Sequence, residues 1–172
     1  MASRNVTIAI YNEEVKVAQF GQWDGYPEVT GCTLLDFLKE QSNVRHLKAI
    51  LPKVNFQSEE DHKKISIHDG SIGGEILDEL LKYKDLEEII LANAYAFAAN
   101  SYWCEWAYVI DLDKNVLEVY RGNNTFGISK EDRFYPLYDG ENEYYPVKIV
   151  ASFLLENLPD EDEFIRQCSQ KI

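Results

Sequence analysis

Basic residues are scarce in this sequence. Seventeen lysines and arginines stand against 30 aspartates and glutamates, which gives a formal net charge of −13 at pH 7. Such a chain repels nucleic-acid phosphates and anionic lipid headgroups over most of its surface. The composition therefore argues against direct nucleic-acid binding and against attachment to a membrane surface. An acidic surface usually serves solubility; the alternative is an acidic inhibitor that mimics DNA or docks on a basic partner.

Cysteine is also scarce. The three cysteines, Cys32, Cys104 and Cys168, are odd in number, far apart in the sequence and without a CxxC pair. This pattern argues against a disulfide framework and favours reduced thiols in the cytoplasm. The three histidines and the cysteines lack the spacing of a zinc site. We therefore predict no metal site, no cofactor and a cytoplasmic location.

Long apolar runs are missing. No stretch approaches the roughly 20 residues that a membrane-spanning helix needs, and the first residues lack the apolar segment of a signal peptide. Hydrophobic residues nevertheless make up 45% of the 172 residues, which is enough for one domain with an ordinary core. We expect a soluble protein with no membrane partner.

The order of the predicted elements indicates the fold class. Five segments have the β-branched or alternating pattern of strands, at 5–10, 15–20, 106–112, 116–120 and 147–155. Apolar stripes with helical spacing lie near 33–38, 44–51 and 76–81, and Pro159 opens a last helix. Few of the connections can be parallel crossovers. The sequence predicts a single α+β domain over 1–172, with a mainly antiparallel sheet of about five strands, built from two hairpins plus a late strand and covered by helices. The polar segment 53–69 is predicted to be a loop insertion.

Aromatic residues, at 13%, are more numerous than a core needs. Gln22, Trp23, Asp24 and Tyr26 place an amide, an indole, a carboxylate and a phenol within five residues, just after the second predicted strand. Rings edged by donors and acceptors suit a flat polar ligand such as a nucleobase or a ribose. The alternative is that the two rings close one end of the core, with Asp24 capping the turn.

A second aromatic group enters the third predicted strand. Alternation along a strand would place its side chains on two faces, with Tyr102, Cys104, Trp106 and Tyr108 on one face and Trp103, Glu105 and Ala107 on the other. A carboxylate among tryptophans is costly unless it has a partner. Arg4 and Arg121, which flank the first and fourth strands, are candidate partners for Glu105 or candidate phosphate clamps. Ordinary surface ion pairs are the alternative.

Two segments of the sequence are similar to motifs of a known protein family. They read GQWDGYP at 21–27 and CEWAYVIDLD at 104–113, and shorter matches lie at 4–5, 117–120 and 145–147. With these segments the chain resembles a family of bacterial, phage and fungal proteins that has no settled activity. The resemblance covers most of the chain and implies a shared fold, but it supplies no catalytic residues. The chain departs from the family pattern at 28–31, where a glycine-rich stretch is expected and EVTG stands instead.

Three functions are compatible with these features. The first is a non-catalytic pocket protein for a nucleotide-like small molecule. The resemblance to phage proteins suggests a phage-encoded sponge that sequesters a nucleotide immune signal, of ADP-ribose or cyclic nucleotide type, in the host cytoplasm.

The second function is the acidic inhibitor or DNA mimic. The third is a small hydrolase with Asp24 or Glu105 as general base, although no catalytic constellation accompanies either carboxylate. Homo-oligomerisation stays open. The predicted ligand-binding residues are Arg4, Gln22, Trp23, Asp24, Tyr26, Trp103, Glu105, Trp106 and Arg121.

Overall fold

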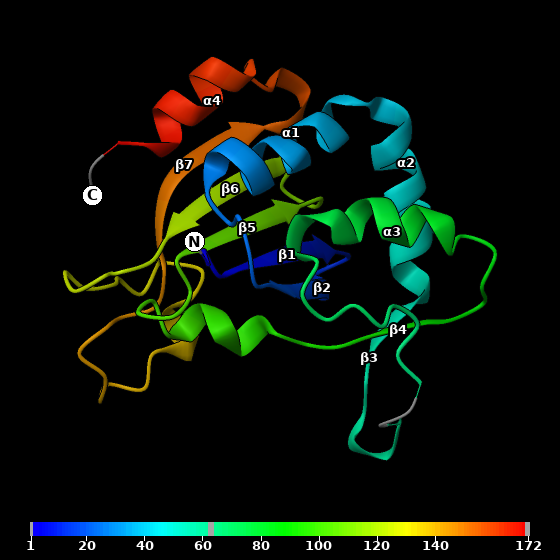
Figure 1. Ribbon diagram of the computed structural model, residues 1–172, viewed down its shortest axis with the longest axis horizontal. Coiled ribbons are helices and arrows are strands. Elements are labelled where there is room, and N and C mark those ends of the chain that lie inside the picture. Colours follow the sequence, from blue (N-terminus) through cyan, green and yellow to red (C-terminus); the bar gives the residue numbers. More distant parts are fainter. Residues whose placement is uncertain (1, 62–63, 171–172) are drawn as a thin grey trace.

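A five-stranded sheet forms the centre of the protein (Figure 1). The computed structural model describes residues 2–61 and 64–170. The strands lie side by side in the order β2-β1-β5-β6-β7. Their bounds are Asn5–Tyr11 for β1, Glu14–Gly21 for β2, Trp106–Asp111 for β5, Val116–Arg121 for β6 and Lys148–Leu154 for β7.

The sheet is assembled from two hairpins and one late strand, as predicted. β1 and β2 are joined by Asn12 and Glu13, which both have positive φ angles, as in the tight turns that match the twist of paired strands. β5 and β6 form the second hairpin, and β7 pairs with β6. The two hairpins meet where β1 pairs with β5, and this contact is parallel. The α+β prediction is confirmed, and the sheet is mixed, with mostly antiparallel pairs.

Four helices cover one face of the sheet (Figure 1). They are α1 Cys32–Lys39, α2 Gln41–Ile50, α3 Ile76–Lys82 and α4 Glu161–Cys168. Their apolar stripes pack on the sheet, for example through Phe164 of α4, whose ring centroid lies 5.1 Å from that of Phe153 in β7. Asp160 caps α4, because its carboxylate accepts a hydrogen bond from the backbone N–H of Glu163 at 2.9 Å. No helix within the described residues is long and apolar enough to cross a bilayer.

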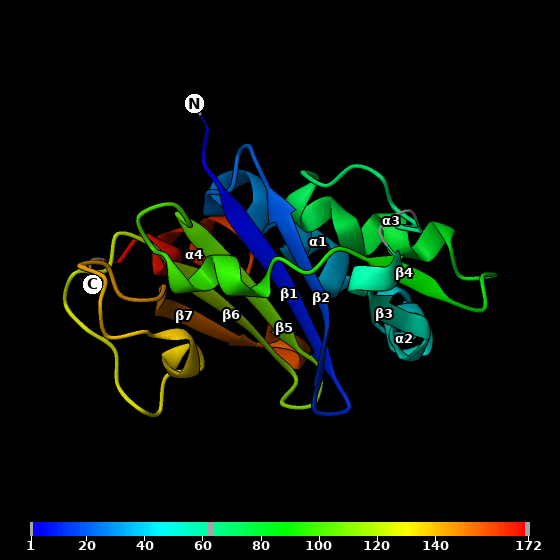
Figure 2. The same ribbon diagram turned by 90° about the horizontal axis from the view of Figure 1, so that it is seen from below.

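A smaller cluster covers the opposite face of the sheet, where the short 3-10 helix Tyr95–Ala99 crosses in front of the strands in Figure 2. Phe134 is fully buried there, with its ring 4.9 Å from that of Tyr120. Cys104 belongs to this cluster, whereas Tyr108 packs with the helices. The prediction that these two side chains share a face is therefore wrong. The strand begins only at Trp106, so its alternation does not extend back to Cys104.

The segment 53–69, predicted to be a loop insertion, contains a short strand. β3 Val54–Phe56 pairs in parallel with β4 Ile89–Leu91 to form a separate two-stranded sheet. Ile67 is buried in the helix-side core. Residues 62–63 of this segment lie outside the described residues.

Asp113 connects the tips of the two hairpins. Its carboxylate accepts hydrogen bonds from the backbone N–H groups of Asn12, at 2.9 Å, and Glu13, at 2.8 Å. Asp113→Ala removes both acceptors at an exposed position where water can replace them, so we expect the free energy of unfolding to fall by about 1 kcal/mol. Urea unfolding measures this change. Asp85→Ala is the control, because this carboxylate is exposed and accepts no hydrogen bond within the described residues; equal losses in the two variants would contradict the prediction.

Candidate functional site

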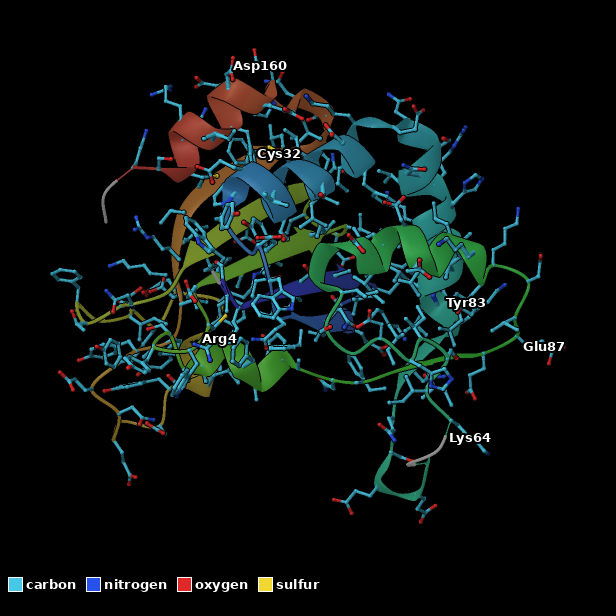
Figure 3. The ribbon with its side chains drawn as sticks, viewed as in Figure 1. Arg4, Cys32, Lys64, Tyr83, Glu87 and Asp160 are labelled. Atoms are coloured by element: carbon cyan, nitrogen blue, oxygen red, sulfur yellow. The ribbon has the colours of Figure 1, made fainter. Side chains whose placement is uncertain are left out.

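One end of the sheet carries all nine predicted ligand-binding residues. A row of paired residues crosses the five strands there and consists of Gly21, Asn5, Trp106, Arg121 and Lys148. β2 and β6 end at this row, and β1, β5 and β7 begin at it. The segments 22–26, 3–4 and 101–105 therefore converge at the end of the sheet next to the N label in Figure 1. Arg4 is labelled at this end in Figure 3.

The nine residues do not share one cavity. Predicted residues line two pockets at this end of the sheet. The first, which we call the strand-end site, has a volume of about 290 Å³ and is lined by Ser101, Tyr102, Glu105, Trp106, Arg121, Gly122 and Asn123. The second, which we call the loop pocket, has a volume of about 240 Å³ and is lined by Trp23, Asp24, Val29, Thr30, Thr33, Asp69, Ser71, Ile72, Gly74 and Glu75. Gln22, Tyr26, Arg4 and Trp103 line neither pocket.

The aromatic residues of the loop after β2 face solvent. Trp23 is 59% exposed and Tyr26 is 36% exposed, so neither ring fills the end of the core. Asp24 has a left-handed backbone, with φ of 50°. The hydroxyl of Tyr26 donates a hydrogen bond to the Asp24 carboxylate at 3.2 Å, and this bond raises the pKa of Tyr26.

Buried Asn5 holds this loop in place. Its side-chain amide nitrogen lies within hydrogen-bond distance of the carbonyl oxygens of Ser3, Gly21 and Trp23. Gly25 must be a glycine, since a Cβ there would lie 2.4 Å from the Ser3 carbonyl oxygen and 2.6 Å from the Asn5 amide. The buried amide of Asn5 and these close backbone contacts therefore fix the position of Trp23.

The charge of the loop pocket makes it unsuitable for a phosphate. Three carboxylates line it, those of Asp24, Asp69 and Glu75, and its lining contains no lysine or arginine. Hydrogen bonds from the backbone N–H and the hydroxyl of Ser71 lower the pKa of Asp69 and so favour its charged form. Among the residues that the structure describes, no group of three acidic, histidine or cysteine side chains is placed to hold a metal ion.

The lining of the strand-end site differs from that of the loop pocket, because it holds one arginine, Arg121, beside one carboxylate, that of Glu105. Arg4 and Lys148 lie next to lining residues without lining the pocket themselves. Arg121 is directly opposite Lys148 in the pairing of β6 with β7. The Arg121 guanidinium lies 5.6 Å from the ring centroid of Trp106, and that of Arg4 lies 4.5 Å from the ring centroid of Trp103. Both distances are typical of cation–π contacts.

These basic groups lack carboxylate partners. Within residues 2–61 and 64–170, Arg4, Arg121 and Lys148 form no ion pair, and the predicted pairing of Glu105 with either arginine does not occur. The Nε of Arg4 is buried and has no hydrogen-bond partner. A buried donor without a partner is costly, and no acceptor within the described residues compensates this one.

Close backbone contacts shape the floor of the strand-end site. The backbone N–H of Gly122 donates to the Glu105 carbonyl at 2.8 Å, and that of Asn123 donates to the Ser101 carbonyl at 2.6 Å. A Cβ on Gly122 would lie 2.0 Å from the carbonyl oxygen of Cys104. The turn before β5 is therefore packed directly on the end of β6, which fixes the positions of Glu105 and Trp106.

Three residues of this region were missed by the sequence reasoning. Lys148 could be placed beside Arg121 only once the strand order was known. Asn123 follows β6 with a left-handed backbone, φ 57°, and its position after Gly122 in a turn was the available signal. Tyr102 was assigned to a strand face, but it is 53% exposed and lines the pocket. Comparison of the chain with protein-family models, with curated protein sequences and with solved structures gives no match.

Proposed function

We propose that the protein binds a nucleotide-like small molecule at the strand-end site without transforming it. The observation that carries the proposal is the pair formed by Arg121 and Lys148. Like charges directly opposite each other on neighbouring strands destabilise a sheet, and no carboxylate within the described residues neutralises this pair. A phosphate bound between the two side chains would relieve their repulsion.

The other groups of the site suit the rest of a nucleotide. The guanidinium of Arg121 can bind two phosphate oxygens at once. Trp106 and Tyr102 offer ring faces for stacking, the Glu105 carboxylate can accept hydrogen bonds from ribose hydroxyls or an amino group, and the Asn123 amide can both donate and accept. A volume of about 290 Å³ is at the lower end for small-molecule pockets and fits a single nucleotide unit.

The biological role that we propose is sequestration. A protein that binds a signalling nucleotide tightly lowers the concentration of the free signal. The resemblance to phage proteins supports a sponge for a nucleotide immune signal in the host cytoplasm. The buried, unpaired cysteines Cys32, Cys104 and Cys168 are compatible with this reducing compartment.

Isothermal titration calorimetry with AMP, ADP-ribose and adenosine tests the proposal. We expect both phosphorylated compounds to bind more tightly than adenosine. We expect Arg121→Gln to weaken AMP binding about tenfold to hundredfold, which is the loss of a charge-assisted hydrogen bond. Arg45→Gln, at an exposed position of α2, is the matched control and should bind AMP as the wild type does.

Two results would overturn the proposal. One is equal affinity for AMP and adenosine, because the basic pair would then contribute nothing. The other is an equal loss of AMP affinity in Arg121→Gln and Arg45→Gln, which would indicate a general effect of net charge instead of a contact.

A further inference from the structure

A third pocket adjoins the strand-end site. We call it the tyrosine groove; it has a volume of about 260 Å³ and is lined by Asn100, Tyr102, Asn142, Glu143 and Tyr144. Tyr102 also lines the strand-end site, so its ring is a wall common to both pockets. The two pockets therefore adjoin at this side chain.

The rings of this region remain accessible. Tyr102 is 53% exposed and Trp103 is 45% exposed. The ring centroid of Tyr102 lies 5.0 Å from that of Tyr144, with an angle of 56° between the ring planes. Because the two rings are tilted, they do not cover each other's faces. Each retains surface on which another flat ring can stack.

The polar groups of the tyrosine groove differ from those of the strand-end site. Its lining contains two amides, those of Asn100 and Asn142, and one carboxylate, that of Glu143, but no basic residue. Amides that donate and accept, next to aromatic faces, suit the edge and face of an uncharged heterocycle. They do not suit a phosphate. Of the two adjoining pockets, only the strand-end site offers a basic group for a phosphate, that of Arg121, whereas the tyrosine groove offers groups that complement a heterocyclic base.

We propose that the ligand of this protein carries two nucleobase-like rings joined through phosphate. This inference rests on the proposed function of the strand-end site. One ring stacks in the strand-end site, the phosphate lies at Arg121 and Lys148, and the second ring occupies the tyrosine groove against Tyr144. The ligand class is therefore a dinucleotide, and linear, cyclic and pyrophosphate-linked dinucleotides all have the required chemistry.

Calorimetric titration of the full chain distinguishes these ligands. The probes are AMP, a linear adenylyl dinucleotide, a cyclic adenylyl dinucleotide and a pyrophosphate-linked dinucleotide. We expect at least one dinucleotide to bind roughly tenfold to hundredfold more tightly than AMP, which corresponds to one additional stacked base. Tyr144→Ala should remove this advantage and leave AMP affinity within about twofold of the wild type, as expected when the second stacking contact alone is lost.

Matched variants distinguish the loss of a stacking contact with the ligand from a loss of protein stability. Tyr144→Phe retains the ring and should retain the preference for the dinucleotide. Tyr138→Ala removes a tyrosine from the same connecting segment, at a position that lines neither pocket, and should also retain it. The thermal midpoint of each variant, measured without ligand, shows whether the fold is intact.

The outcomes are distinguishable. Equal affinity for AMP and every dinucleotide overturns the inference and leaves the proposed function standing. Loss of AMP binding in Tyr144→Ala, with an unchanged thermal midpoint, also overturns it, because Tyr144 would then belong to the first binding site. Failure of the wild type to bind any of the four probes overturns both the inference and the proposed function.

Discussion

Replacing Arg133 by methionine is expected to lower the free energy of unfolding by about 3 kcal/mol. The Arg133 guanidinium lies between two carboxylates, at 3.0 Å from that of Asp111 and in direct contact with that of Glu118. Glu118 also accepts a hydrogen bond from the hydroxyl of Tyr120 at 2.7 Å. Burial opposes the charge of Arg133, but the contact with Glu118 outweighs it and raises the pKa of the guanidinium.

The expected loss arises from the carboxylates that remain. Methionine preserves most of the side-chain volume but leaves Asp111 and Glu118, whose side chains are only 4% and 12% exposed, without their counter-ion. Breaking a buried ion pair on one side costs about 3–5 kcal/mol, and the 17% exposure of Arg133 favours the lower end of that range.

Denaturant unfolding of three variants isolates this interaction. Arg133→Met is compared with Glu118→Gln and with the double variant, which should lose less stability than the sum of the two single losses because the groups are coupled. Arg166→Met is the control, since its ion pair with Glu163 is exposed and should contribute no more than about 1 kcal/mol. Similar losses in Arg133→Met and Arg166→Met would contradict the expectation.

Gly122→Ala is the second substitution with a large expected effect. The added Cβ would lie 2.0 Å from the Cys104 carbonyl oxygen and 2.6 Å from that of Ser101, and both obstacles are backbone atoms. Neither can rotate away, so the end of β6 must separate from the turn before β5. We expect the free energy of unfolding to fall by about 1–3 kcal/mol, as for other overpacked sites.

The same displacement would disturb ligand binding. Gly122 lines the strand-end site between Arg121 and Asn123, so we expect AMP affinity to fall together with stability. Gly70→Ala is the matched control, because no atom lies within 4 Å of the Cβ position there; its stability should stay within about 0.5 kcal/mol of the wild type. Urea unfolding and calorimetric titration of both variants check these outcomes, and wild-type stability in Gly122→Ala would refute the steric argument.

Local patterns were sufficient to predict most of the elements. The alternating, β-branched sequences of β1, β2, β5 and β6 indicated two hairpins, and the apolar stripes of α1 to α3 indicated helices, because both signals lie within a few residues. The parallel pairing of β1 with β5 was not predictable from such signals. It depends on how the two hairpins dock, and this contact joins residues about 100 positions apart, such as Asn5 and Trp106.

The sequence reasoning singled out five residues that line the two pockets, but not their division between the pockets: Trp23, Asp24, Glu105, Trp106 and Arg121. The sequence indicated that Trp23 and Trp106 belong to aromatic, polar segments, and the strand order brings both segments to the same end of the sheet. Their separation into an acidic pocket and a pocket that holds Arg121 could not be predicted. It depends on Asp69, which comes from the segment before α3 and lines only the first of the two pockets.

The parallel contact between β1 and β5 links ligand binding to the stability of the sheet. Each hairpin is closed by its own turn, but the contact between them joins segments that are distant in sequence, and such contacts cost more chain entropy to close. Arg4 belongs to one hairpin, whereas Glu105 and Arg121 belong to the other. The carbonyl of Arg4 also accepts a hydrogen bond from the backbone N–H of Glu105, so the strand-end site lies at the boundary between the two hairpins. A ligand that binds only the folded protein there stabilises it against unfolding.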